Sequence, residues 1–251
     1  MPFTFAHPAI IIPFKKWEKY FNITALIIGS MAPDFEYFLR FKPMGEIGHT
    51  FLGFFYFNLP LCFIIAHVFH FVVKKPFLLN MPKPIERWFY VVAFEQWRIK
   101  DLSALVVFIY SSLIGMVSHV VWDSFTHRGG FFVTKIPLLS KYIPFMHYEI
   151  PIYKFLQHSS TLIGFAIIFS YLYVNRNLYK RMRRLISSKI KWIYWCFSLF
   201  IAIAIVYYRI YFVLGGFNLN YLGSHIVSVI NGGIIGVTVT SLIFNILFKY
   251  E

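Results

Sequence analysis

The chain of 251 residues is 59% hydrophobic and 22% aromatic, with a mean hydropathy of +0.65. Because soluble domains contain about 45–50% apolar residues, this composition excludes an ordinary soluble domain and predicts an integral membrane protein. The formal net charge is +14. The Lys and Arg residues responsible for it lie mostly in short loops between apolar runs, which is typical of cytoplasmic loops. No nucleic-acid-binding motif accompanies the charge, so we expect no nucleic-acid partner.

Nothing in the sequence divides the chain into separate domains. It contains no Ser/Gly-rich linker, low-complexity block or internal repeat, so we expect a single integral-membrane domain over residues 1–251. The two cysteines, Cys62 and Cys196, lie inside apolar runs. They exclude a disulfide framework and a Cys-x-x-Cys site, so any metal ion would need histidine and carboxylate ligands.

The first 46 residues form an N-terminal segment that we expect to contribute to a metal site. His7 precedes Pro8, and a residue before proline is biased away from the α region, so an extended entry is predicted. The apolar part of residues 17–31 is too short to cross about 30 Å of hydrocarbon and predicts a buried or interfacial helix. Asp34 follows a proline directly, where a carboxylate could cap a helix, bind a metal ion, or do both.

Five apolar stretches predict membrane spans. They cover residues 47–73, 102–127, 159–174, 192–214 and 221–248. The expected fold is therefore all-α: a polytopic membrane helix bundle with about five transmembrane helices and short N-terminal buried or interfacial helices. In this organisation residues 47–127 hold spans one and two, and residues 159–251 hold spans three to five. Residues 128–158 form a connector on the same side of the membrane as the expected metal site.

The charges between the spans orient the chain. Seven cations lie within residues 176–191, whereas residues 215–220 contain no Lys or Arg. By the positive-inside rule we expect the 176–191 loop to be cytoplasmic in a multi-pass protein of the cell (inner) membrane. Residues 1–46 and 128–158 then lie on the external face, and they share one face even if the whole topology is inverted.

Span two ends in a polar stretch from Ser118 to His127. In a helix with 3.6 residues per turn, His119 and Asp123 lie one turn apart, so one ion could touch both side chains. His127 lies a further turn along and drifts off that line. Ionisable side chains at hydrocarbon depth cost about 2.5–3.5 kcal/mol each, so three together need pairing, water or a metal ion. The alternative is a polar helix end that lies in the headgroups.

Six polar residues are expected on the same membrane face: His7, Asp34, His49, His119, Asp123 and His127. Imidazoles and carboxylates without cysteine suit zinc or another first-row divalent ion that keeps positions open for water. Such an ion supplies hydroxide for hydrolysis, for example of a phosphoester. Arg128 and Lys135 could hold phosphate oxygens, although snorkelling interface cations are the alternative. No Gly-x-Ser-x-Gly elbow supports a serine nucleophile.

Five motifs stand out along the chain. They are Met1-Pro2-Phe3-Thr4-Phe5-Ala6-His7-Pro8-Ala9, the stretch from Gly29 to Tyr37, Gly48-His49-Thr50, the stretch from Ser118 to His127, and Gln157-His158-Ser159-Ser160. Together they resemble an uncharacterised bacterial family of integral membrane proteins, a domain of unknown function. The likeness covers essentially the whole chain, and family membership alone implies no activity.

A more distant resemblance concerns the order His, Pro-Asp, His-Thr/Ser and His-x-x-x-Asp. This order is similar to the membrane-bound metal-dependent hydrolases and, more faintly, to zinc phospholipase C and the single-strand nucleases. It implies a divalent metal, with zinc expected, and a bridging Asp123 with His7 on a neighbouring ion. The implied ligands are Asp34, His49, His119 and Asp123. The soluble zinc enzymes use an N-terminal tryptophan, whereas residue 1 is Met here, so one or two ions are expected rather than three.

The sequence therefore predicts a membrane-bound metal-dependent hydrolase that acts on a phosphoester of lipid or envelope origin at the membrane boundary. His7 and His127 are the candidate catalytic residues, which would complete the site or move a proton. The candidate substrate contacts are Arg128, Lys135, Gln157 and His158. The expected partners are membrane lipids and a phospholipid-like substrate. The alternative is a non-catalytic protein: a divalent-ion transporter, or a scaffold whose histidines only join helices.

Overall fold

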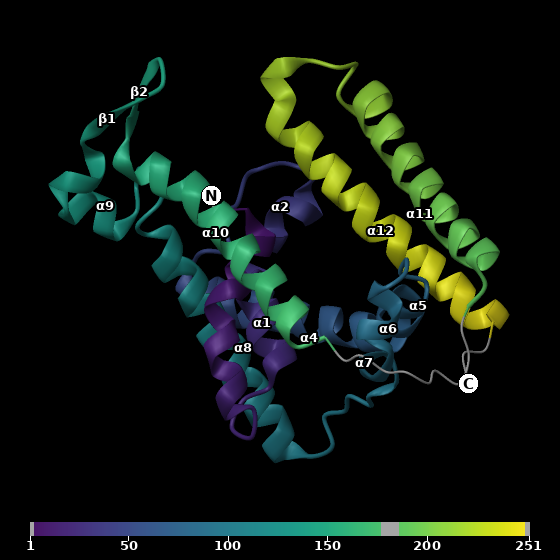
Figure 1. Cartoon of the computed structure of the whole chain (residues 1–251). Coiled ribbons are helices and arrows are strands. Elements are labelled where there is room, and N and C mark those ends of the chain that lie inside the picture. Colours follow the sequence, from purple (N-terminus) through teal and green to yellow (C-terminus); the bar gives the residue numbers. More distant parts are fainter. Residues whose placement is uncertain (1–2, 177–185, 249–251) are drawn as a thin grey trace. The chain divides into compact units, whose positions relative to one another are not determined.

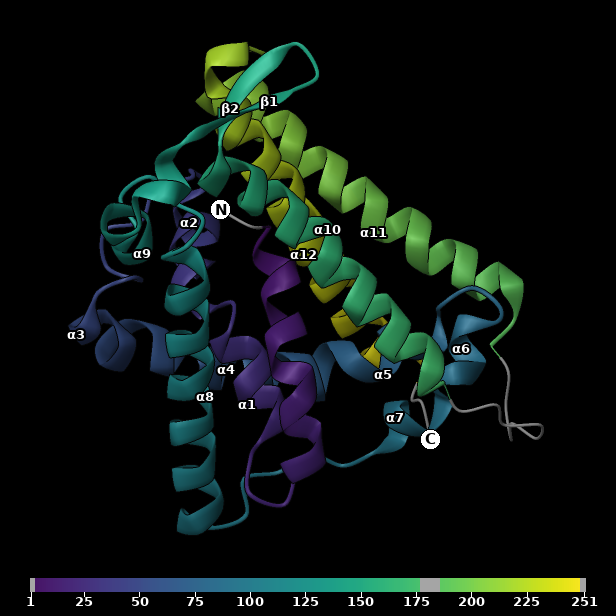
Figure 2. The same ribbon diagram turned by 60° about the vertical axis from the view of Figure 1, so that its left-hand side comes forward.

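The computed structural model describes residues 3–176 and 186–248. Within these residues five helices are long and apolar enough to cross a membrane (Figure 1, Figure 2): Phe51–Leu79, Leu102–Asp123, Ile152–Val174, Ser188–Val213 and Leu219–Phe248. The expected all-α membrane fold with about five spans is confirmed. The third span begins earlier than residue 159, and the second ends at Asp123 rather than at residue 127.

The first span is longer than expected and contains two π-helical turns. It consists of α3 (Phe51–Gly53), the π-helical η3 (Phe54–Asn58), α4 (Leu59–His67), the π-helical η4 (Val68–Val73) and α5 (Lys74–Leu79). Residues 74–79 thus continue the helix beyond the expected end of the span at residue 73. The segment between this span and the second one holds two short helices, α6 (Ile85–Trp88) and α7 (Tyr90–Phe94).

The other spans are more regular. The second and third are the helices α8 (Leu102–Asp123) and α10 (Ile152–Val174). The fourth is α11 (Ser188–Tyr208) with the π-helical η6 (Arg209–Val213), and the fifth is the 3₁₀ turn η7 (Leu219–Tyr221) with α12 (Leu222–Phe248). Of the loop expected to be cytoplasmic, Lys180, Arg181, Arg183 and Arg184 lie outside the described residues.

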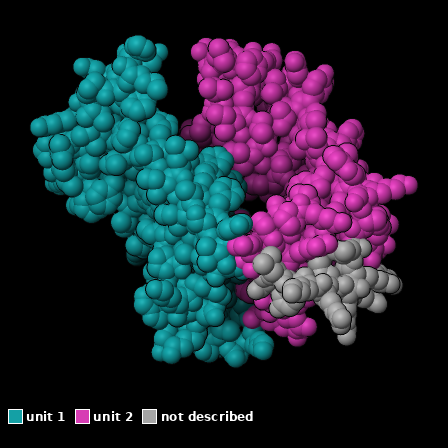
Figure 3. Space-filling view, in the orientation of Figure 1, with its two compact units in different colours: residues 1–35, 46–63, 99–175 teal, residues 36–45, 64–98, 176–251 magenta. Residues whose placement is uncertain are grey.

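The chain forms two compact units (Figure 3). Unit 1 comprises Met1–Phe35, Glu46–Phe63 and Ile99–Asn175, and unit 2 comprises Glu36–Gly45, Ile64–Arg98 and Arg176–Glu251. All six polar residues singled out in the sequence belong to unit 1. The single-domain interpretation of residues 1–251 stays a prediction.

Helix α1 (Ile23–Gly29) lies against α8 in unit 1, and two glycines allow the close approach (Figure 2). A Cβ added to Gly29 would lie 2.3 Å from the carbonyl oxygen of Ser112, and one on Gly115 would lie 2.5 Å from the carbonyl oxygen of Leu26. Because packed interiors leave no room for such contacts, a side chain at either position would push the helices apart. The 3₁₀ turn η2 (Ala32–Asp34) and α2 (Phe35–Arg40) follow α1, so this packing brings Asp34 to the last turns of α8.

The N-terminal segment is a 3₁₀ helix, η1 (Thr4–Trp17), so the expected extended entry at His7 is wrong. Packing explains the difference, because Ala6, Ala9 and Ile11 of this helix are buried. Ala6 contacts α10, where a Cβ on Gly164 would lie only 3.0 Å from it. Tertiary contacts thus override the local preference of a residue that precedes proline.

The connector after α8 adds a small amount of β structure. It contains α9 (Phe131–Lys135), the 3₁₀ turn η5 (Pro137–Ser140) and the antiparallel strands β1 (Tyr142–Phe145) and β2 (Tyr148–Pro151). Tyr142 pairs with Pro151, and Phe145 pairs with Tyr148. Met146 turns the hairpin with a positive φ of 53°. Because α10 begins directly after β2, the hairpin lies at the start of the third span.

In unit 2, α11 and α12 pack together through small residues. A Cβ on Gly236 would lie 2.4 Å from the carbonyl oxygen of Ser198, and one on Gly232 would lie 2.8 Å from that of Ala202. These glycines thus permit close packing of the two helices. The hydroxyl groups of Tyr194 and Ser241 lie 2.7 Å apart in the buried interface of the two helices.

We expect Gly115→Ala to destabilise the protein by about 1–3 kcal/mol, the usual cost of overpacking a close-packed interior. The thermal unfolding of detergent-purified protein, followed by circular dichroism, measures the effect as a lower Tm. Gly129→Ala is the matched control, because a Cβ at Gly129 meets nothing within 4 Å. Equal Tm values for the two variants would contradict the role assigned to Gly115.

Candidate metal centre

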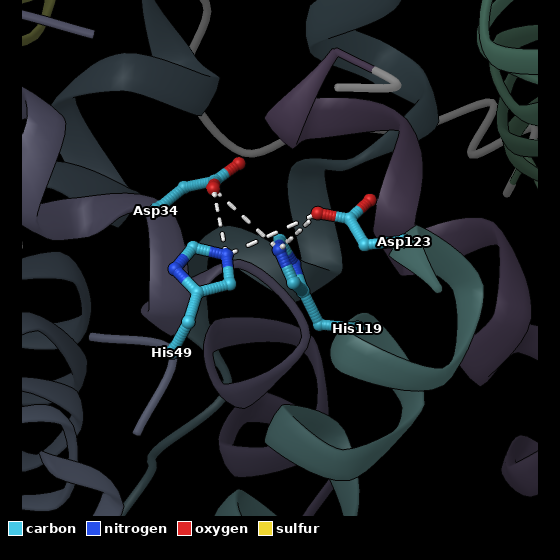
Figure 4. Close-up of side chains that lie close together, drawn as sticks. All are labelled: Asp34, His49, His119 and Asp123. Carbon is cyan, nitrogen blue, oxygen red and sulfur yellow. Dashed lines mark ion pairs between the residues drawn. The ribbon is translucent and has the colours of Figure 1, made fainter. Parts of the chain in front are cut away.

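Four side chains from three separate chain segments converge in unit 1 (Figure 4). Asp34 comes from η2, His49 from the turn before α3, and His119 and Asp123 from the last turns of α8. One ligand atom from each lies within 4.8 Å of the others. The Oδ1 atom of Asp34 lies 3.6 Å from Nε2 of His49 and 3.5 Å from Nε2 of His119. The Oδ2 atom of Asp123 lies 3.3 Å from Nε2 of His119 and 3.9 Å from Nε2 of His49.

These separations fit a bound divalent ion. Ligand atoms about 2.0–2.2 Å from a tetrahedral zinc ion lie roughly 3.3–3.6 Å from one another. Three of the four measured distances fall in or next to this range, and His49 to Asp123 is the longest. Two carboxylates and two imidazoles without a thiolate suit zinc and neighbouring first-row ions. The group could therefore hold a metal ion, as expected from the sequence.

Two of the ligand atoms are buried polar atoms without a hydrogen-bond partner in the described part of the chain. They are Oδ1 of Asp34 and Nε2 of His119. Both side chains have no exposed surface, and a buried polar group without a partner costs about 1–3 kcal/mol. A cation between them would satisfy both atoms. A proton on Nε2 of His119 would also pair with the two carboxylates, so a proton and a metal ion compete for this position.

Hydrogen bonds outside the group fix which ligand atoms face inward. The Nδ1 atom of His119 lies 2.7 Å from the buried carbonyl oxygen of Ser30, so Nδ1–H donates and the lone pair of Nε2 faces the group. The hydroxyl of Thr4 donates to Oδ2 of Asp34 at 2.6 Å, which leaves Oδ1 turned toward the histidines. Sequence reasoning missed Thr4 and Ser30, although both lie in motifs that it singled out.

A further residue that sequence reasoning missed holds the turn that carries His49. Asn58 is completely buried, and its Nδ2 donates to the carbonyl oxygen of Gly48 at 2.6 Å. Asn58 ends the π-helical η3, and π-helical turns are frequent at functional sites. Thr50 caps α3 by accepting a hydrogen bond from the backbone N–H of Gly53 at 3.0 Å. An Asn inside an apolar span was the signal that could have found this residue.

His7 and His127 lie on the other side of the Asp123 carboxylate. The Oδ1 atom of Asp123 lies 3.6 Å from Nε2 of His7 and 3.7 Å from Nδ1 of His127. His7 is fully buried, both of its ring nitrogens lack a hydrogen-bond partner among the described residues, and its ring stacks on His119 at 3.9 Å. Asp123 thus faces four histidines from two sides.

His127 reaches the group because α8 ends at Asp123. The turn after the helix brings Nδ1 of His127 to 2.9 Å from the carbonyl oxygen of Asp123. The expectation that His127 lies in the last turn of the span is wrong, since the chain leaves the helix before it. The side chains of His49 and His127 are each 32% exposed, whereas His7, His119 and Asp34 have no exposed surface. The group therefore opens to its surroundings beside His49 and His127.

Two histidines of the group that precede the first span, His7 and His49, have lowered pKa values and are neutral at pH 7. Burial, helped by the neighbouring His119 and opposed by Asp123, lowers the pKa of His7 to about 3. Burial also lowers the pKa of the His49 imidazole below its usual value, against the opposing effect of Asp34. A neutral imidazole is the form that binds a metal ion or accepts a proton.

The four candidate substrate contacts do not join the group directly. Arg128, Lys135 and His158 are exposed, whereas Gln157 is buried in α10. In the described ranges, no hydrogen bond or ion pair links their side chains to the metal-ligand candidates. Their assignment as substrate contacts stays a prediction.

Comparison with known proteins gives a family but no activity. Residues 1–242 match the family described as Domain of unknown function (DUF4184). No curated protein and no solved structure matches the chain. The match covers nearly the whole sequence and confirms the resemblance to an uncharacterised family.

We expect Thr4→Val to weaken metal binding by about 10–100-fold, the usual effect of removing a residue that orients a metal ligand. Valine keeps the shape of the side chain and removes only the hydrogen bond to Asp34. Competition with a zinc-binding dye measures the Kd in detergent. Thr134→Val is the control, because among the described residues the hydroxyl of Thr134 bonds only the carbonyl oxygen of Phe131 within α9. Equal zinc affinities for the two variants would show that Thr4 does not orient Asp34.

Proposed function

We propose that the chain, which belongs to this family of unknown function, is a membrane-bound metal-dependent hydrolase. One observation carries the proposal: four ligand atoms from three chain segments lie within 4.8 Å of one another at the ends of membrane-spanning helices. Buried atoms without partners on Asp34 and His119 support a bound cation at this point. We propose zinc as the ion, with one or two ions per chain.

A bound ion of this kind would lower the pKa of its water to about 7 and so supply hydroxide for attack on a phosphoester. Asp34, His49, His119 and Asp123 would hold the ion. His7 lies 3.6 Å from Oδ1 of Asp123, and its low pKa keeps the imidazole neutral, so it would complete the site as a neutral ligand rather than act as a base. His127 lies beside the same carboxylate oxygen with a partly exposed side chain and can pass a proton outward.

The position of the site suits a substrate at the membrane boundary. His49 lies two residues before the first span, and Asp123 is the last residue of the second. Both ligands are therefore at span ends, where the hydrocarbon gives way to headgroups. We propose a phosphoester of lipid or envelope origin as substrate, with membrane lipids as partners. The exposed Arg128, Lys135 and His158, together with Gln157, would contact its phosphate or headgroup.

We propose that this boundary is the external face of the cell (inner) membrane. Residues 215–220, after the fourth span, contain no Lys or Arg, whereas seven cations lie in residues 176–191, before that span. The positive-inside rule then leaves the site outside.

The convergence of the polar residues favours a hydrolase over the non-catalytic alternatives. A scaffold whose histidines only join helices would scatter these residues among several packing contacts. An ion transporter usually places its ligands near the middle of the membrane on interrupted helices. The ligands here lie at the ends of spans, which supports chemistry at the boundary.

The hydrolysis of bis(p-nitrophenyl) phosphate by detergent-purified protein tests the proposal. We expect zinc-dependent release of p-nitrophenolate that a chelator removes and that added zinc restores. Asp34→Asn should lose this activity, because the neutral amide of Asn replaces a negatively charged carboxylate ligand and would bind the ion more weakly. Glu149→Gln is the control, since it removes an exposed carboxylate of β2 that lies outside the group. Activity that survives both chelation and Asp34→Asn would contradict the proposal.

A further inference from the structure

The β-hairpin at the start of the third span has one apolar face (Figure 1). Successive side chains of a strand point to opposite faces, and residues that pair across an antiparallel ladder share a face. In this hairpin Ile143 pairs with Ile150, and Phe145 pairs with Tyr148. These four side chains therefore lie together on one face, which we call the apolar face of the hairpin.

The opposite face of the hairpin is more polar. There Tyr142 pairs with Pro151, and Pro144 pairs with Glu149. Glu149 is the one acidic residue in the sequence from residue 128 to residue 158. The hairpin is therefore amphipathic, with its carboxylate directed away from the apolar face.

The rest of unit 1 covers the apolar face only in part. Phe145 and Tyr148 are 45% and 75% exposed, and Met146 at the turn is 87% exposed. Ile143 and Ile150 are half-buried. A two-stranded hairpin is marginally stable in water by itself, and contiguous exposed apolar side chains usually mark an interaction surface. The apolar face is thus a candidate interaction surface.

This surface continues onto the outer side of the third span. The ring centroids of Phe145 and Phe155 lie 5.8 Å apart, and Phe155 is in the first turn of α10. Leu162 and Phe169 follow Phe155 at intervals of seven residues, about two turns each, so the three side chains share one side of the helix. They are 37%, 73% and 65% exposed. The apolar face therefore adjoins the side of α10 that lipid would cover.

Cations surround the hairpin at the end of the span. The connector of residues 128–158 has one carboxylate and four exposed cations: Arg128, Lys135, Lys141 and Lys154. The carbonyl oxygen of Lys141 accepts a hydrogen bond of 2.9 Å from the backbone N–H of Ile152, the first residue of α10. Lys154 lies in the first turn of the same helix. Two lysines are thus fixed beside the hairpin at the membrane boundary, where they would attract anionic headgroups.

We propose that the apolar face of the hairpin inserts into the headgroup region of the bilayer, where Lys141 and Lys154 contact anionic phospholipids. Tyrosine rings are enriched at this level of a membrane, and lysine stems lie along apolar surface while the ammonium groups reach the phosphates. The occupant is the anionic lipid of the protein's own membrane, because the apolar face continues the outer side of a span. The surface lies outside the metal-ligand group and does not depend on the proposed hydrolase activity.

Photo-crosslinking from two positions of β1 tests which face meets lipid. Phe145 and Tyr142 are exposed aromatic residues on opposite faces of the strand. The two variants are Phe145→p-benzoylphenylalanine and Tyr142→p-benzoylphenylalanine, each in the full-length protein. The vesicles contain equal amounts of phosphatidylcholine and phosphatidylglycerol, and mass spectrometry of the digested protein measures the lipid adducts.

We expect several-fold more lipid adducts from position 145 than from position 142. Both variants must keep the circular dichroism spectrum of the wild type. Equal lipid adducts from the two positions would overturn the proposal. Crosslinks from position 145 to a second copy of the chain in place of lipid would also overturn it, because the face would then be a contact between copies.

Two lysine variants test the headgroup chemistry with the same crosslinker at position 145. Lys141→Gln and Lys154→Gln should each lower the ratio of phosphatidylglycerol to phosphatidylcholine adducts by about fivefold, the effect of one lysine near an anionic surface. Lys100→Gln is the matched control, because Lys100 is exposed but one span separates it from the hairpin. A ratio that is the same in all three variants would overturn the choice of an anionic lipid. The expected adducts in a protein that hydrolyses no phosphoester would support this surface and contradict only the proposed function.

Discussion

The close contact of α1 with α8 at Gly29 and Gly115 determines where the polar residues of unit 1 meet. Because no side chain separates the two helices, the turn after α1 runs past the last turns of α8. The carbonyl oxygen of Ser30 then accepts a hydrogen bond from His119, and Asp34 faces the same imidazole. Apolar packing between two helices thus positions a buried group of charges that no local sequence preference could hold.

Burying these polar side chains destabilises the folded protein unless hydrogen bonds or a bound ion pair with their polar atoms. Asp34, His7 and His119 are removed from solvent at the end of a membrane span, where unpaired polar atoms are expensive. Thr4, Ser30 and Asn58 satisfy some atoms from outside and orient the rest inward. A bound cation would satisfy the inward-facing atoms of Asp34 and His119.

Much of the fold could be predicted because a membrane span is recognised from the hydropathy of its own stretch of sequence, without knowledge of distant contacts. The five spans here are long apolar runs of this kind. The ligand types were also visible, since ionisable residues at span ends are rare and stand out. The supporting residues could not be found in this way. Thr4 is 30 residues from its partner Asp34, and Ser30 is 89 residues from His119. The 3₁₀ helix at His7 was missed because distant contacts override the bias imposed by Pro8.

The central claim is that the converging carboxylates and imidazoles bind a metal ion. Elemental analysis of detergent-purified wild type beside Asp123→Ala, by mass spectrometry of bound metals per chain, tests it most directly. The account predicts one or two zinc-like ions in the wild type and their loss in the variant, because Asp123 faces ligands on both sides. The absence of metal from both proteins, or an equal metal content in both, would contradict it.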